Sequence, residues 1–245
     1  MNNENVKQNN FDITNYESLL EMFNSSTIPE NEKLYHLGLF TKRQPMSRFL
    51  FMYEVYKRII NVHGVIFEFG VRWGQDLAWY ENFRGIFEPY NYNRRVVGFD
   101  TFEGFPSVSD YESNSKTGDF SVTKGYENEL EKILSIHSKN NPISHMKKHE
   151  LIKGDATVTV EKYLKEHPET IISFAYFDFD IYEPTKVCLD LCKDHFVKGS
   201  IIGFDEVNHP DWPGETVALK EVFGLNNIKL ERVPFSPTQS FFVVQ

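Results

Sequence analysis

The chain has 245 residues, of which 35 are Asp or Glu and 26 are Lys or Arg, so its formal net charge is −9. An acidic chain lacks the clustered basic side chains that neutralise phosphates, which argues against a general nucleic-acid binder. Aromatic residues make up 15% of the sequence, and this apolar load argues against disorder. The length predicts one globular domain with a large core and modest additions.

The two cysteines, Cys188 and Cys192, lie four residues apart in a segment that reads as helix. This spacing predicts neither a disulfide framework nor a four-ligand zinc site, so we expect free, buried thiols. The polar N-terminus MNNENVKQNN predicts no secretory signal, and no apolar run approaches the ~20 residues of a membrane helix. We therefore expect a soluble, cytoplasmic protein without a membrane span.

The predicted elements begin with a loose tail over residues 1–12 and two helices over 15–23 and 45–62. From residue 64 onward, strands alternate with helices, which predicts an α/β fold with a mostly parallel sheet and helices on both of its faces. The strands are expected at 64–70, 94–100, 150–154, 171–178 and 199–205, and the helices at 75–88, 126–138, 157–166 and 184–195.

Two further predicted strands, 228–233 and 240–244, would form an antiparallel hairpin at one edge of a seven-stranded sheet. We interpret residues 1–63 as a tail and helices that cover the active site, and residues 64–245 as the main domain. Within that domain, residues 101–125 are rich in Ser, Gly, Asp and Thr, and they are longer than an ordinary connection. This segment is interpreted as a lid-like insertion.

A glycine turn, Gly70-Val-Arg-Trp-Gly74, joins the first strand of this series to its helix. Glycines at such a turn let the backbone bend sharply and approach a ligand closely, although many turns of this kind only pack a helix onto a strand. The next strand ends in Asp100, whose carboxylate is suited to a ribose diol. Together these residues indicate a nucleoside-containing cofactor.

Four carboxylates follow two of the predicted buried strands. Asp178 and Asp180 end one strand and would share a side if the extended geometry continued, while Asp205 and Glu206 end the next. Crowded carboxylates repel one another, and a cation relieves that cost; an all-oxygen set suits Mg²⁺ or another hard divalent cation. The alternative is two solvated strand ends with ordinary helix-capping acids.

Three blocks, GFDTFEGFP (98–106), FDFDIYEPT (177–185) and GFDE (203–206), resemble those of the macrocin O-methyltransferase family. The resemblance implies a Rossmann-like class I methyltransferase fold, S-adenosylmethionine as the methyl donor and a sugar hydroxyl as the acceptor. This sequence departs from the family pattern at Glu206, where the family usually has Asp. It also has Arg72 before Trp73, whereas the family more often has Trp before Arg.

The same resemblance implies specific roles for individual residues. Asp178, Asp205 and Glu206 would bind Mg²⁺, and Asp180 would be the general base. His209, which follows the second acid pair, is a further candidate catalytic residue. The cofactor site would comprise Glu68, Gly70, Val71, Gly74, Asp100, Thr101, Gly154, Asp155 and Asp178.

The acceptor is expected to be a small-molecule sugar, and we favour a nucleotide-linked sugar for surface polysaccharide biosynthesis. A glycosylated natural product and a catechol-type small molecule are alternative acceptors. A non-catalytic nucleoside-binding protein is an alternative from outside the enzymes, but four acids at strand ends argue against it. A homo-oligomer is possible on this sequence.

Overall fold

The computed structural model describes residues 10–112 and 115–245. The chain divides into two compact units, one ending at Arg48 and the other comprising Phe49–Gln245. No helix in these described ranges is long and apolar enough to cross a membrane.

The first unit contains helices α1 (Asn10–Ser25) and α2 (Glu30–Tyr35) and the first residues of α3 (Arg43–Ile59). The predicted tail is wrong for residues 10–12, which are the start of α1, and residues 1–9 lie outside the described residues. Helix α2 was not predicted. Its start follows from Pro29, which precedes the helix, and from acidic side chains in its first turn.

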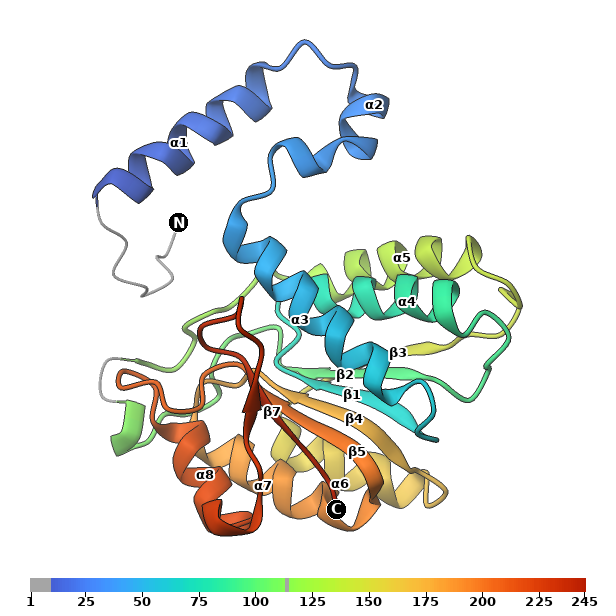
Figure 1. The fold of residues 1–245 in the computed structure, drawn as a ribbon, viewed down its shortest axis with the longest axis vertical. Helices are drawn as coiled ribbons and strands as arrows, with labels where there is room; N and C mark the ends of the chain where they lie inside the picture. The colour runs from blue at the N-terminus through green and yellow to red at the C-terminus, as the bar shows by residue number, and fades with distance from the viewer. Residues whose placement is uncertain (1–9, 113–114) are drawn as a thin grey trace. The chain divides into compact units, whose positions relative to one another are not determined.

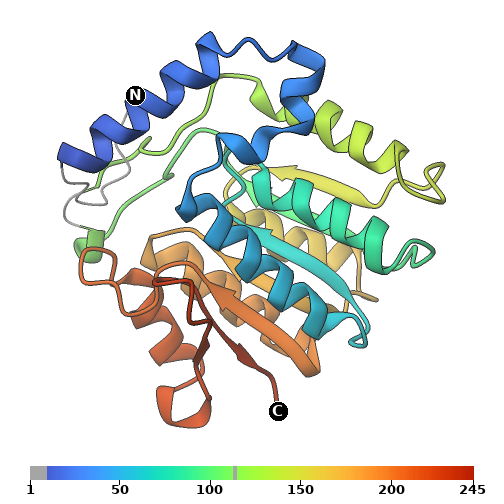
Figure 2. The same ribbon diagram turned by 45° about the horizontal axis from the view of Figure 1, so that its top comes forward.

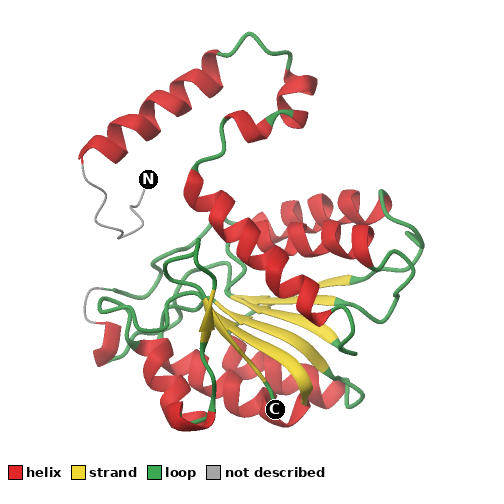
Figure 3. Ribbon diagram, viewed as in Figure 1, coloured by secondary structure: helices red, strands yellow, loops and turns green. Residues whose placement is uncertain are grey.

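The second unit is a seven-stranded sheet with helices on both faces, which confirms the predicted fold class (Figure 3). The strands are β1 (Val65–Phe69), β2 (Val96–Asp100), β3 (His149–Lys153), β4 (Ile172–Phe177), β5 (Phe196–Phe204), β6 (Glu231–Arg232) and β7 (Ser240–Val243). Their order is β3-β2-β1-β4-β5-β7-β6; β7 pairs antiparallel with β5 and β6, so the edge hairpin is confirmed.

The helices of this unit are α3 from Phe49 onward, α4 (Gln75–Phe87), α5 (Tyr126–Lys139), α6 (Ala156–Glu166), α7 (Tyr182–Cys192) and α8 (Gly214–Val222). Helix α7 begins two residues before the predicted Pro184, because proline is tolerated in a first helical turn. Helix α8 was not predicted. Figures 1 and 2 show α3, α4 and α5 on one face of the sheet and α6, α7 and α8 on the other.

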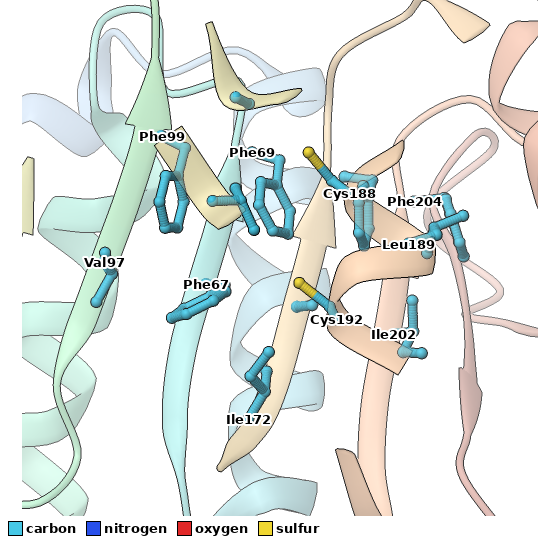
Figure 4. Close-up of a cluster of buried hydrophobic side chains, with 14 of the residues drawn as sticks. Phe67, Phe69, Val97, Phe99, Ile172, Cys188, Leu189, Cys192, Ile202 and Phe204 are labelled. Atoms are coloured by element: carbon cyan, nitrogen blue, oxygen red, sulfur yellow. The ribbon is translucent and has the colours of Figure 1, made fainter. Parts of the chain in front are cut away.

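Alternation along the strands divides the core between these two faces. Ile66, Val96 and Phe174 pack with the helices of the first face, whereas Phe67, Val97 and Ile202 pack with those of the second. Cys188 and Cys192 are buried free thiols on α7, as expected, and Figure 4 shows them facing the second group of side chains. The sheet is therefore buried on both faces, as the continuous apolar strands predict.

Five phenylalanines stack side by side across the sheet near the carboxyl ends of its parallel strands; Figure 4 labels three of them, Phe69, Phe99 and Phe204. Neighbouring ring centroids are 4.4–6.4 Å apart and the rings are within 26° of parallel. In order across the sheet, they are Phe99, Phe69, Phe177, Phe204 and Phe242. Part of the large phenylalanine content thus forms a continuous apolar layer directly beneath the loops that follow these strands.

A buried arginine organises the opposite, amino end of the sheet. Arg94, 1% exposed, donates to the Glu88 carboxylate at 2.9 Å and to the carbonyl of Gly64 at 2.7 Å. It also donates to the carbonyls of Ile59 and Val62, both at 2.9 Å, at the end of α3. One guanidinium therefore joins the end of α3 to the residues that precede β1 and β2.

Candidate active site

Parallel register brings four of the predicted site residues, Gly70, Asp100, Asp178 and Asp205, to one edge of the sheet. Backbone hydrogen bonds continue one residue beyond each strand: Gly70 donates to Phe99, Asp178 to Phe69, and Asp205 to Phe177, at 2.9–3.0 Å. The carboxyl ends of β1, β2, β4 and β5 are thus aligned. Their loops are the place where open α/β sheets bind ligands.

The glycine turn after β1 has backbone conformations that other residues rarely adopt. Gly70 has φ +88° and Gly74 has φ +74°. A Cβ atom on Gly70 would lie 2.0 Å from the carbonyl oxygen of Asp178, and one on Gly74 would collide with the side chain of Leu130. The turn is therefore packed directly against the acid-bearing loop after β4. The neighbouring predicted cofactor residue Val71 is buried.

Asp100 is placed at the end of β2, where the sequence predicts it, but it already has protein partners. One carboxylate oxygen accepts the backbone N–H of Arg72 at 2.7 Å, and the other accepts that of Phe102. Burial raises the pKa of Asp100, and these hydrogen bonds offset part of that effect. Asp100 therefore braces the glycine turn from the adjacent strand.

Three other predicted cofactor residues have local structural partners. The hydroxyl of Thr101 donates to the carbonyl of Gly104 at 2.7 Å, within the insertion. Gly154 has φ +138°, and its N–H donates to the carbonyl of Asp100 at 2.9 Å. Asp155 is the N-cap of α6 and accepts from the N–H of Thr157 at 2.9 Å. Glu68 lies buried on β1 beneath the glycine turn.

The loop after β4 departs from the geometry that the sequence suggests. The strand ends at Phe177, and Asp180 has φ +62°, so the extended alternation that would put Asp178 and Asp180 on one side does not continue. The two carboxylates are nevertheless close enough for the charge of Asp178 to act strongly on Asp180. Asp180 is brought to the cluster by a left-handed turn, which is uncommon outside glycine.

Asp205 is held in place by two side chains from neighbouring elements. The hydroxyl of Tyr176 donates to its Oδ1 at 2.7 Å, and the amide nitrogen of Gln239 donates to the same oxygen at 2.6 Å. Gln239 in turn accepts from the hydroxyl of Ser236. The connection between β6 and β7 thereby fixes the orientation of this carboxylate.

Glu215 is a fifth acid of the site, and our sequence analysis missed it. It is completely buried near the start of α8, and its Oε2 accepts the backbone N–H of Glu206 at 3.1 Å. Its Oε1 is buried without a hydrogen-bond partner among the described residues. An acid at a helix start is ordinarily a solvated dipole partner, so the sequence alone carries no signal for this contact.

Burial and the like charges of neighbouring acids act in the same direction on the pKa values of this cluster. Burial, followed by the charges of Asp178, Glu206, Glu215 and Asp205, raises the pKa of Asp180 well above its usual value. Burial and the charge of Asp205 likewise raise the pKa of Glu215. We refer to these five residues as the acid cluster. A divalent cation is the chemical group that such a set of oxygen donors suits.

The side chains of the acid cluster are not arranged as a finished metal centre. Across residues 10–112 and 115–245, no three His, Cys, Asp or Glu side chains are placed to hold a metal ion. The donor chemistry of Asp178, Asp205 and Glu206 nevertheless fits a hard cation, since all the donors are carboxylate oxygens that repel one another without it.

His209 lies in the turn that follows Glu206. Its backbone N–H donates to the carbonyl of Glu206 at 3.0 Å, and its Nδ1 accepts from the N–H of Asp211 at 3.3 Å. The predicted catalytic candidate is therefore located beside the acid cluster, in a loop that is tied to it through the backbone. Its catalytic role stays a prediction.

The insertion after β2 contacts both acid-bearing loops through an apolar cluster. Phe105 and Phe120 of the insertion pack on Trp212, with ring centroids 6.2 and 6.0 Å from it, and Ile181 joins the same group. Ile181 directly follows Asp180, and Trp212 comes six residues after Glu206. The insertion thus packs next to the acid cluster.

No family model matches this chain, and no curated protein sequence matches it. Solved structures do. The crystal structure of CalS11, a calicheamicin methyltransferase, is 39% identical over 97% of this chain and 94% of that chain, with a TM-score of 0.95.

Two further solved structures extend this comparison. The apo structure of CalS11, described as a TDP-rhamnose 3'-O-methyltransferase of calicheamicin biosynthesis, is 36% identical over 97% of this chain and 96% of that chain, with a TM-score of 0.87. The O-methyltransferase NovP shares the fold, with a TM-score of 0.64 and 15% identity over 80% of this chain and 79% of that chain.

Proposed function

This chain belongs to the S-adenosylmethionine-dependent sugar O-methyltransferases, and we propose that it transfers a methyl group to a hydroxyl of a nucleotide-linked sugar. The observation that carries the acceptor class is the 36–39% identity, over almost the whole chain, to a TDP-rhamnose 3'-O-methyltransferase. The assignment to surface polysaccharide biosynthesis stays a prediction.

S-adenosylmethionine is proposed to bind at the glycine turn, beside Glu68, Gly70 and Asp100. The close contact between Gly70 and the carbonyl of Asp178 supports this placement, because it brings the cofactor turn and the acid cluster together. Methyl transfer requires the acceptor oxygen and the methyl carbon to be held in line, and adjoining sites fulfil that requirement. The described parts of the insertion, residues 101–112 and 115–125, are proposed to cover the acceptor.

Asp180 is proposed to accept the proton of the acceptor hydroxyl. A sugar hydroxyl is a weak acid, so a base within reach is needed at neutral pH. Burial, followed by the charges of the neighbouring acids, raises the pKa of Asp180, so its affinity for a proton is greater than that of an ordinary surface carboxylate.

Asp178, Asp205 and Glu206 are proposed to bind a divalent cation such as Mg²⁺. When bound, the cation would polarise the acceptor hydroxyl and lower its pKa. The chain's own contribution is to orient the ligands: Tyr176 and Gln239 fix Asp205, and Glu215 holds the backbone of Glu206.

A methyl-transfer assay with a panel of acceptors tests this proposal. We expect a TDP-linked deoxyhexose to be methylated and the corresponding free sugar and catechol to be poor acceptors. Thorough chelation should abolish turnover, and added Mg²⁺ should restore it. Preferential methylation of a catechol or a glycosylated natural product would contradict the proposed acceptor class. Activity undiminished by chelation would contradict the proposed cation. Cofactor binding without any methyl transfer would favour a non-catalytic protein.

A further inference from the structure

Glu112, in the insertion after β2, is a buried carboxylate whose partners lie in two different parts of the domain. It is 2% exposed and ends a short 3-10 helix, Asp110–Glu112. Its Oε1 accepts the backbone N–H of Tyr182 at 2.8 Å, 70 positions later in the sequence. Its Oε2 accepts from the N–H and the hydroxyl of Ser109, at 2.8 and 2.6 Å.

The contact with Tyr182 places this carboxylate at the start of α7. The first N–H groups of a helix have no intrahelical partner, and a negative charge is favourable there. The residue that precedes α7 is Ile181, whose side chain makes no capping hydrogen bond. Glu112 therefore supplies, from the insertion, a cap that α7 lacks in its own sequence. The capped residue, Tyr182, lies two positions after Asp180.

The same carboxylate packs against the start of α8. A Cβ atom on Gly214, the first residue of that helix, would lie 2.5 Å from Oε1 of Glu112 and 2.6 Å from the backbone nitrogen of Tyr182. The next residue, Glu215, accepts the N–H of Glu206. Glu112 thus contacts the beginnings of both helices that follow the acid-bearing loops.

Hydrogen bonds and apolar packing have different roles in this attachment. The contacts of Phe105 and Phe120 with Trp212 bring the insertion onto the loops, but apolar contact is non-directional and fixes no single position. Bonds to a charged acceptor are directional and about twice as strong as neutral ones. Glu112 is a carboxylate of the insertion whose hydrogen bond reaches the start of α7, and the ring of its neighbour Tyr111 also contacts that of Tyr182, with centroids 5.0 Å apart.

We propose that Glu112 is a positioning residue that anchors the insertion next to the acid cluster and thereby sets the affinity for the sugar acceptor, leaving the affinity for the cofactor unchanged. This inference rests on the proposed function, because it takes the insertion to cover the acceptor. The cofactor turn, by contrast, is held by Asp100 and by the contact of Gly70 with Asp178, which do not involve Glu112.

The test compares Glu112→Ala with Asp110→Asn, a control that removes an exposed acid from the same 3-10 helix. Hydrogen exchange of the protein alone should show faster exchange at the amides of Tyr182 and Ser109 in Glu112→Ala and no change in Asp110→Asn. In the methyl-transfer assay, the acceptor KM of Glu112→Ala should rise about tenfold, as expected from losing a charge-assisted hydrogen bond. The dissociation constant of S-adenosylhomocysteine should stay within about twofold, because the contacts that hold the cofactor turn do not involve Glu112.

Glu112→Gln provides a second variant that keeps the shape of the side chain. Its amide oxygen still accepts one N–H, so both exchange and acceptor KM should fall between those of the wild type and of Glu112→Ala. Unchanged exchange in Glu112→Ala would overturn the anchor, and equal losses of acceptor and cofactor affinity would overturn its acceptor-specific role. If the wild type methylated no sugar, the proposed function would fail, while hydrogen exchange alone would still decide whether Glu112 anchors the insertion.

Discussion

Glu88 and Asp180 are acids at opposite ends of the same sheet, and their pKa values are shifted in opposite directions. Burial raises the pKa of Glu88, but hydrogen bonds from Arg94 and Tyr56 outweigh it and lower that pKa below its usual value. Asp180 has acidic neighbours instead, and its pKa is raised. At the amino end each charge is balanced within the protein, whereas the acid cluster at the carboxyl end concentrates charge of one sign.

This difference separates a structural region from a functional one. A balanced buried network joins helix to strand and leaves nothing for a ligand to neutralise. Concentrated like charge destabilises the ligand-free protein, and it persists where a function requires it. We therefore expect substitutions at the amino end to lower the stability of the protein and substitutions in the acid cluster to raise it.

The largest effect on stability is expected from Arg94→Met at the amino end. This change leaves Glu88 buried without its cation and frees several backbone carbonyls, so the free energy of unfolding should fall by about 3–5 kcal/mol. Urea denaturation measures it. The neighbouring Arg95, partly exposed and paired with Glu169 at 3.8 Å, provides the control, since Arg95→Met should cost no more than ~1 kcal/mol. Similar losses for both variants would contradict the structural role of Arg94.

At the carboxyl end, Asp180→Asn should lower the catalytic activity and raise the stability of the protein. Loss of a general base is expected to lower turnover about 10²- to 10⁴-fold. Without a cation, the free energy of unfolding should rise by about 1–2 kcal/mol, because a repelled buried charge is removed. Methyl-transfer kinetics and urea denaturation measure the two quantities. Asp190→Asn, at an exposed position of α7, should change neither. Unchanged turnover in Asp180→Asn would rule out the base.

The smallest effect is expected in the pH dependence of stability. Because the folded-state pKa of Glu88 is lowered, its contribution to stability is complete above the pKa of the unfolded chain, near 4.3, and is lost as the pH falls through the folded-state value. Glu88→Gln should therefore have a shallower loss of stability in acid than the wild type. Urea denaturation between neutral and acidic pH measures the slope, with Glu161→Gln as the exposed control. Equal slopes for Glu88→Gln and the wild type would show that the pair does not act through charge.

The sequence predicts the carboxyl end of the sheet well where register decides the outcome. Asp178 and Asp205 directly follow buried parallel strands, and strand pairing brings them to one edge. The antiparallel hairpin is also predicted, although β6 comprises only Glu231–Arg232 where the sequence predicts a strand over 228–233. The pattern of a strand contains both its faces and its end, so these features are readable from local sequence.

Contacts between distant segments were not predictable in this way. In the sequence, Glu112 is one acid of the polar insertion and Glu215 lies in a stretch where no helix was predicted. Only the packing of α7 and α8 buries them against Tyr182 and Glu206. Asp155, which the family resemblance assigns to the cofactor site, also caps α6, a contact that the sequence analysis did not predict; its cofactor role stays a prediction. The left-handed turn at Asp180 also depends on its surroundings, since a strand pattern predicts continued extension.

The contact between Gly70 and the carbonyl of Asp178 limits how such an enzyme can diversify. With φ +88° and 2.0 Å between a hypothetical Cβ and that oxygen, position 70 accepts glycine alone without moving the β4 loop. A library randomised at position 70 should therefore return only glycine among active clones.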